Sequence, residues 1–156
     1  MDKTINLFVS HSGSDETRID DFKNLMGNAG YSFHDSSIRE SDPNKAKSEE
    51  YIKSGILAPA IKWAGTMIVL IGNDTHKSDW VNWEIEYAAK NEKKIIGVFL
   101  PGERDAELPD ALKKFGDGCV GWNKEKIKEA LESDVSKWED NEGNTFYPNE
   151  MTHITC

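Results

Sequence analysis

The sequence predicts a single α/β domain in which a parallel sheet is covered by helices on both faces. Segments with strand character alternate with segments of helical spacing along the chain. The apolar runs at 67–71 and 95–100 lack the alternation of a half-exposed strand, which is typical of strands buried on both faces. With 156 residues the chain can form one domain around a substantial core.

Five strands are predicted from their apolar and β-branched residues. They fall at 5–10, 31–34, 66–71, 94–100 and 119–122. For a sheet of this size the expected strand order is the flavodoxin-like 2-1-3-4-5. In that order a ligand crevice opens at the carboxyl ends of the first and third strands.

Helices are predicted between these strands. Ser14 is the predicted N-cap of the first helix, whose apolar residues recur at 19, 22, 25 and 26. An apolar stripe over 51–61 contains Pro59, which predicts a kink there. Three further helices are predicted over 79–91, 109–115 and 124–138. The domain is expected to span 1–138, with 139–156 as a C-terminal tail that is docked or disordered.

Composition excludes several classes of function. There are 19 basic and 28 acidic residues, a formal charge of −9, which argues against binding to a nucleic-acid backbone. No apolar run approaches the roughly 20 residues that a bilayer-spanning helix requires, and no signal peptide is evident. The two cysteines, Cys119 and Cys156, suit a reducing compartment, so we expect a cytoplasmic protein. No side chains have metal-ligand spacing, and no metal is predicted.

The stretch from Ser78 to Glu84 is the strongest functional signal. It follows the third predicted strand and opens a predicted helix, on which Trp80 and Glu84 lie one turn apart on the same face. Ligand sites of open α/β sheets form at this point. A single helical Glu is more commonly a solvated surface residue, however, and tryptophans are commonly core. Spacing alone therefore leaves both interpretations open.

Polar residues also follow the first two strands. Ser10, His11 and Ser12 end the first strand, and Asp35 and Ser36 end the second, at the same edge of the predicted sheet. Their hydroxyls and carboxylate could bind ribose or phosphate. Turn formation, capping and strand termination account for them equally well.

Two segments of the sequence resemble the TIR domain family. Leu7-Phe8-Val9-Ser10 followed by a polar loop is similar to the opening of a TIR domain. The run 68–72, followed by Trp80-x-x-x-Glu84, resembles the third TIR strand and its Trp-x-x-x-Glu helix. The resemblance covers about residues 4–133 and is closest to the compact bacterial branch, which includes the TIR protein of the Thoeris anti-phage system. One departure is the first loop, His11-Ser12-Gly13, where many TIR proteins have tyrosine and basic residues.

The resemblance implies an activity, because many bacterial TIR proteins cleave NAD between nicotinamide and ribose. It implies that Glu84 is catalytic and that NAD is a substrate rather than a cofactor. The candidates for binding this substrate are the residues placed at the predicted crevice: Ser10, His11, Ser12, Asp35, Ser36 and Trp80. The product would be a linear, cyclic or conjugated ADP-ribose that activates a separate effector protein. The family also forms homo-oligomers through TIR–TIR contacts.

Two other functions fit parts of the sequence. Many TIR domains are interaction modules without chemistry, although the Trp80–Glu84 spacing favours an enzyme. A flavodoxin-type FMN carrier would suit the length and acidity, but Trp80 and Glu84 are misplaced for holding a flavin. A phospho-receiver is excluded, because it needs an acidic pair after the first strand, where this chain has Ser10, His11 and Ser12.

Overall fold

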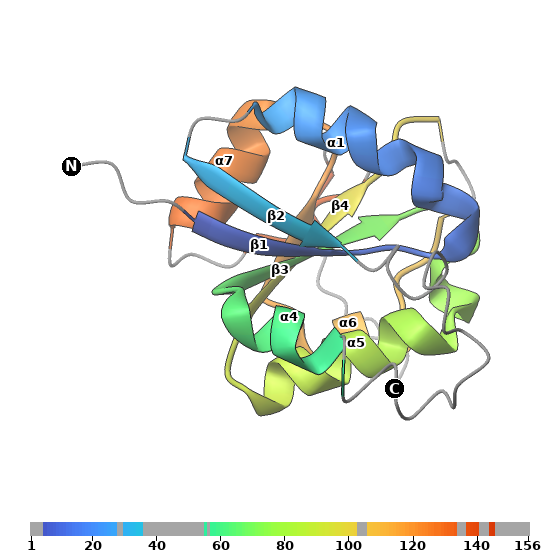
Figure 1. Ribbon diagram of the computed structural model, residues 1–156. Helices are drawn as coiled ribbons and strands as arrows, with labels where there is room; N and C mark the ends of the chain where they lie inside the picture. Colours follow the sequence, from blue (N-terminus) through green and yellow to red (C-terminus); the bar gives the residue numbers. More distant parts are fainter. Residues whose placement is uncertain are drawn as a thin grey trace.

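The computed structural model describes residues 5–27, 30–35, 55, 57–102, 106–133, 137–140 and 144–145, without the side chains at 14, 16 and 35. They contain one five-stranded sheet of order β2-β1-β3-β4-β5 (Figure 1). All four strand pairings are parallel. The predicted fold class and strand order are confirmed. The strands are β1 (Ile5–Ser10), β2 (Tyr31–Asp35), β3 (Thr66–Ile71), β4 (Lys94–Phe99) and β5 (Gly118–Val120).

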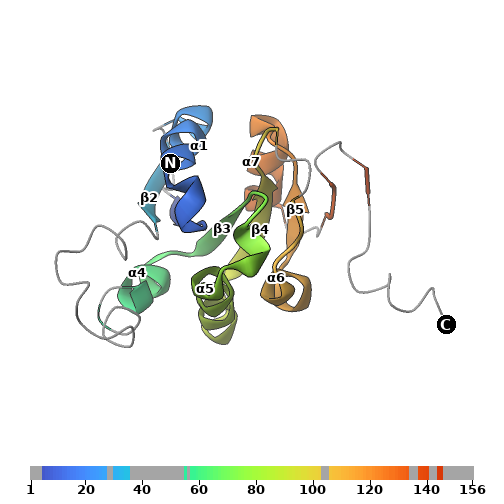
Figure 2. The same cartoon turned by 90° about the vertical axis from the view of Figure 1, so that its right-hand side faces the viewer.

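Helices cover both faces of the sheet (Figure 2). One face carries α1 (Ile19–Met26) and α7 (Lys124–Glu132). The other carries α4 (Ala58–Trp63), α5 (Asp79–Lys90) and α6 (Asp110–Phe115). Two short 3-10 helices, η1 (Gly13–Arg18) and η3 (Thr75–Lys77), follow β1 and β3.

The strands are buried on both faces because neighbouring residues point to opposite sides of the sheet. On β3, Val69 and Ile71 pack with α4, α5 and α6, whereas Ile68 and Leu70 pack with α1 and α7. All six residues of β3 are buried. An uninterrupted apolar run is therefore what this central strand requires, as the sequence predicted.

Two predicted helix features differ in the structure, and a third, at Pro59, stays a prediction. Ser14 lies inside η1, and α1 begins only at Ile19, so Ser14 is not the N-cap of α1. Pro59 lies in the first turn of α4, and Gly55 and Leu57 just before it have π-helical backbone, so the kink at Pro59 stays a prediction. Residues 51–54 and 56 of that predicted stripe lie outside the described residues. The predicted helix over 124–138 ends at Glu132, because Ser133 is extended and residues 137–139 pair with β5.

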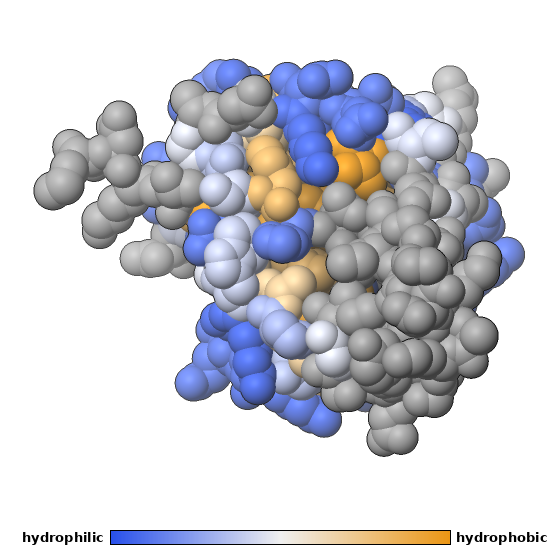
Figure 3. All heavy atoms as spheres, viewed as in Figure 1, coloured by the Kyte–Doolittle hydropathy of each residue, from blue (hydrophilic) through white to orange (hydrophobic). Residues whose placement is uncertain are grey.

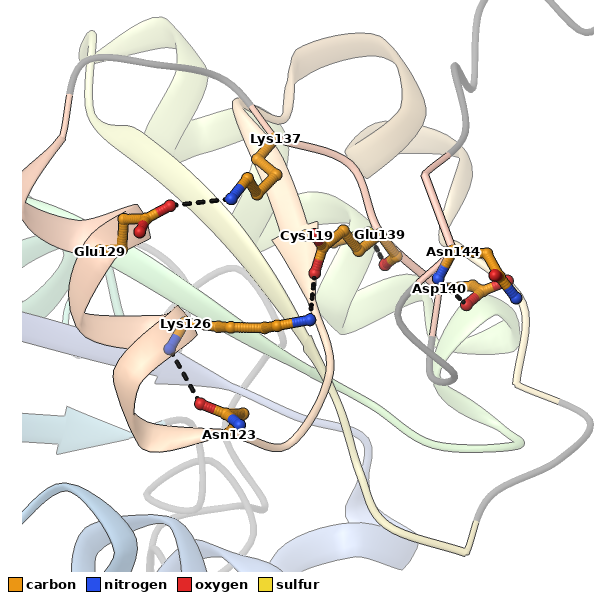
Figure 4. Close-up of polar contacts among 8 residues, drawn as sticks. All are labelled: Cys119, Asn123, Lys126, Glu129, Lys137, Glu139, Asp140 and Asn144. Atoms are coloured by element: carbon orange, nitrogen blue, oxygen red, sulfur yellow. Dashed lines mark hydrogen bonds and ion pairs between the residues drawn. The ribbon is translucent and has the colours of Figure 1, made fainter.

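The segment 137–140 runs beside β5 (Figure 4). The Cys119 N–H donates to the Lys137 carbonyl at 2.9 Å, and the Glu139 N–H donates to the Cys119 carbonyl at 2.9 Å. Side chains fasten the segment to α7, through Lys126–Glu139 and Lys137–Glu129 contacts of 2.9 Å each. Backbone pairing and ion pairs together cover the β5 edge, which would otherwise be open to pairing with another strand.

The buried Cys119 thiol is expected to be chemically inert in the folded protein. Burial raises the pKa of Cys119 from 9.0 to about 12. In a Cys156→Ser variant, a disulfide reagent at pH 7 should react with Cys119 about 1,000-fold more slowly in buffer than in urea, because raising the pKa from 9.0 to about 12 lowers the thiolate population by that factor. The contribution of the neutral Cys119 thiol to the free energy of unfolding is fully present below pH 9 and is lost as the pH rises toward 12. Equal labelling rates would contradict this assignment.

The face seen in Figure 3 carries mainly hydrophilic side chains on its described part, with small apolar areas between them. This agrees with the acidic composition of the chain. Among the described residues, no helix combines the length and apolar character needed to cross a membrane.

Candidate functional site

Helix α5 brings Glu84 to the carboxyl end of the sheet. The Ser78 hydroxyl caps this helix by accepting a hydrogen bond from the Val81 N–H at 3.2 Å. Ser78 is extended, as an N-cap residue should be, and Asp79 adds an acidic side chain to the first turn. The cap fixes where α5 begins, and with it which face Glu84 occupies. That face is buried, and it also carries Val81, Ile85 and Ala88.

Glu84 meets the end of β1 through a direct hydrogen bond. The Ser10 hydroxyl donates to Glu84 Oε1 at 2.7 Å, across 74 residues of sequence. Both side chains are 0% exposed. The register of the sheet places Ser10, the last residue of β1, opposite Val69 of β3, so it lies at the edge where the crevice is predicted. Burial of this short hydrogen bond lowers the effective dielectric constant around the carboxylate, so its charge acts strongly on a neighbouring group.

Beyond Ser10, the loop after β1 is held by its own polar contacts. His11 is 1% exposed, and its Nδ1 lies 2.8 Å from the Ser12 carbonyl oxygen. A carbonyl can only accept, so the proton of His11 is on Nδ1. The Ser12 hydroxyl donates to Asp15 Oδ2 at 3.1 Å. This loop is therefore held by buried hydrogen bonds.

Trp80 is half-buried and packs against the apolar cluster beneath α5. Trp83 and Tyr87 stack at a centroid distance of 5.2 Å and an interplanar angle of 17°. Trp83 and Tyr87 therefore form a packed pair one turn apart on α5. Of the two tryptophans, Trp80 lies one turn before Glu84 toward the start of α5.

The remaining predicted site residues follow β2. Asp35 is opposite Val9 in the register, one strand away from the Glu84 contact, and its side chain lies outside the described part of the structure. Ser36 lies outside the described residues altogether. The structure thus joins Ser10 to Glu84, whereas Asp35 reaches the same edge only by its backbone position.

Two buried polar residues, Asp15 and Thr75, were not predicted from the sequence. Asp15 is 5% exposed and Thr75 is 0% exposed. The Thr75 hydroxyl lies 3.5 Å from Asp15 Oδ2 and 3.2 Å from the Leu70 carbonyl oxygen. A signal for Asp15 existed, since a carboxylate three residues after Ser12 can close a polar turn. For Thr75 the only signal was its place just beyond the third strand.

No group of three or more His, Cys, Asp or Glu side chains within the described ranges is arranged to hold a metal ion. The polar groups at this edge of the sheet are hydroxyls, one imidazole and two carboxylates.

The strand order, together with a Trp80-x-x-x-Glu84 helix at the carboxyl edge of the sheet, defines a TIR-like domain. A comparison with protein families matches residues 8–105 to the family described as Thoeris protein ThsB, TIR-like domain. The match covers more than half of the chain, and the chain belongs to this family.

Three solved structures with similarity to this chain come from different kinds of protein. The Clostridium botulinum CMP N-glycosidase BcmB is 22% identical, with a TM-score of 0.47, over 81% of this chain and 99% of that one. A conserved protein from Enterococcus faecalis V583 is 10% identical, with a TM-score of 0.47, over 87% and 82%. The TIR domains of the activated Roq1 resistosome, which recognises the pathogen effector XopQ, are 19% identical, with a TM-score of 0.41, over 72% and 64%. No curated protein matches the chain.

Proposed function

We propose that this TIR-like domain cleaves NAD between nicotinamide and ribose, with Glu84 as the catalytic carboxylate. The observation that carries the proposal is the buried 2.7 Å hydrogen bond from Ser10 to Glu84 Oε1 at the carboxyl edge of the sheet. The released ADP-ribose moiety, in linear, cyclic or conjugated form, would be a signal that activates a separate effector in anti-phage defence. NAD is a substrate in this account, and no cofactor is required.

The chemistry needs only one carboxylate. Nicotinamide in NAD is a pyridinium, so when the C1′–N1 bond breaks, the bonding electrons neutralise the ring and the base leaves without being protonated. This differs from ordinary glycosidases, which need a second carboxyl group as acid. Positive charge develops on the ribose, and the Glu84 carboxylate stabilises it. Water, or a nucleophilic atom of the same molecule, then adds to C1′, and a water nucleophile loses its proton.

The surroundings of Glu84 support this role. Ser10 holds one carboxylate oxygen in place, so little reorganisation is needed when charge develops. Burial lowers the effective dielectric constant around the carboxylate and strengthens its interaction with a cationic ribose. Trp80, one turn away, offers an aromatic face against which nicotinamide or adenine could stack.

A non-catalytic interaction module is the second candidate function, and one observation favours it. The Glu84 side chain is 0% exposed, as expected if the Ser10–Glu84 pair only ties β1 to α5. The enzyme account therefore requires residues around Glu84 to move when NAD binds. Contacts between copies of the domain are one source of such movement, and activity should then rise with protein concentration.

The test is incubation of the chain with NAD at several protein concentrations, followed by chromatography and mass spectrometry. We expect nicotinamide and an ADP-ribose product, whose mass distinguishes attack by water from attack by an internal atom. CMP is the comparison substrate, because cytosine is not a cationic leaving group and should be released far more slowly. Absence of nicotinamide at every concentration, also with phage-infected lysate added, would leave the interaction module in its place.

A further inference from the structure

A second buried contact joins the same two strand ends as the Ser10–Glu84 bond. It centres on the Asp15 carboxylate, which lies between the loop after β1 and the turn after β3. We propose that Asp15 is a positioning residue that sets the separation between Ser10 and the helix carrying Glu84. The proposal rests on the proposed function of the Ser10–Glu84 pair and adds to it the residue that aligns the pair.

On the β1 side, Asp15 closes a turn immediately after Ser10. Its backbone N–H donates to the Ser12 carbonyl at 3.0 Å, and its Oδ2 accepts from the Ser12 hydroxyl at 3.1 Å. Ser12 is two residues from Ser10, so the direction in which the chain leaves β1 is fixed by Asp15.

On the β3 side, the same carboxylate lies against Gly72. A Cβ atom at Gly72 would lie 2.4 Å from Asp15 Oδ2, so an added methyl group would force the Asp15 carboxylate to shift. The Gly72 N–H donates to the Thr75 hydroxyl oxygen at 2.7 Å. The single Thr75 hydroxyl proton is shared between Asp15 Oδ2 at 3.5 Å and the Leu70 carbonyl at 3.2 Å. Close packing and hydrogen bonding together hold the β3 turn against Asp15.

This turn leads directly into α5. The Ser78 N–H donates to the Thr75 carbonyl at 3.1 Å, and Ser78 is the N-cap of the helix that carries Glu84. Asp15 is therefore linked to the helix of Glu84 by consecutive contacts, first with Thr75 and then from Thr75 to the cap residue Ser78. Displacing a catalytic group by about 1 Å can lower a rate by about 100-fold, so a residue that fixes this path affects catalysis without touching substrate.

The test compares two matched glycine substitutions. Gly72→Ala pushes a methyl group into the Asp15 carboxylate and alters no functional group. Gly118→Ala is the control, because its Cβ would lie 2.6 Å from the Lys137 carbonyl oxygen, a backbone atom at the β5 edge and away from the Ser10–Glu84 contact. We expect Gly72→Ala to lower kcat for nicotinamide release about tenfold or more with little change in KM. Gly118→Ala should keep the wild-type kcat, even if its urea midpoint falls as far below the wild-type midpoint as that of Gly72→Ala.

Three further variants and one further readout keep the test independent of folding and of activity. Asp15→Asn should lower kcat as Gly72→Ala does. Thr75→Val, which removes the hydroxyl, should also lower kcat, whereas Thr75→Ser, which keeps the hydroxyl, should have nearly the wild-type kcat. In ¹⁵N-labelled protein, the amide signals of Ser10 and Glu84 should shift in Gly72→Ala and stay unchanged in Gly118→Ala. Folded Gly72→Ala and Asp15→Asn proteins with wild-type kcat and unshifted Ser10 and Glu84 signals would overturn the proposal. If the wild-type chain does not cleave NAD, the proposed function fails and the amide signals alone decide the role of Asp15.

Discussion

Replacing Glu84 by Gln is expected to lower nicotinamide release from NAD by about 100- to 1,000-fold, the usual effect of removing one preorganised electrostatic group. Gln has the shape of Glu, and its amide oxygen can still accept the Ser10 hydroxyl bond that measures 2.7 Å in the structure. Only the negative charge is removed. Because that charge is what stabilises the cationic ribose, kcat should fall while KM for NAD changes little.

The matched control for this prediction is Glu86→Gln. Glu86 is on the same helix and is exposed, whereas Glu84 is buried. Both variants remove one negative charge from α5, so a general effect of net charge would appear in both. Glu84→Gln should remain folded, since neutralising a buried charge while keeping its hydrogen bond costs little stability. Equal activity of Glu84→Gln and Glu86→Gln would exclude Glu84 from the chemistry.

The largest effect on stability is expected at Gly97, in the middle of β4. A Cβ atom there would lie 2.8 Å from Ile71 Cδ1, 2.9 Å from Leu112 Cδ2 and 3.1 Å from Cys119 Cβ. Glycine at this position lets α6 pack directly on the sheet. Gly97→Ala should lower the free energy of unfolding by about 1–3 kcal/mol, the typical cost of overpacking a core. Gly97→Val adds two more methyl groups and should prevent folding, as shown by loss of a cooperative urea transition.

Gly65→Ala is the control for Gly97. No atom lies within 4 Å of a Cβ built at Gly65, and this residue is exposed just before β3. The free energy of unfolding of Gly65→Ala should stay within about 0.5 kcal/mol of the wild-type value, as for most surface substitutions. If Gly97→Ala and Gly65→Ala have the same free energy of unfolding, α6 does not pack as tightly on β4 as described.

The sheet could be predicted because long buried strands have an unambiguous pattern. The apolar run of β3 admits no exposed face, and the cap residue Ser78 marks the start of α5 within one residue. Spacing also placed Glu84 near the carboxyl end of the sheet. It could not show that Glu84 bonds to Ser10, because the 74 residues between them are joined only by the fold.

Where tertiary contacts outweigh local preference, the predictions from sequence were incomplete or wrong. Asp15 and Thr75 look like ordinary turn residues, and only the packing of one strand end on another buries them together. The segment around Trp138 has no local signal that distinguishes a last helical turn from an extended strand. The segment is extended because its backbone pairs with Cys119 of β5.

The measurement that tests the central claim most directly is nicotinamide release from NAD by Glu84→Ala, with and without added sodium formate. Removing the side chain leaves a cavity beside Ser10 into which a small carboxylate fits. We predict that Glu84→Ala is inactive, that formate restores release, and that formamide, which has the same size and no charge, does not. Release at the wild-type rate by Glu84→Ala without any addition would contradict the assignment of Glu84 as the catalytic carboxylate.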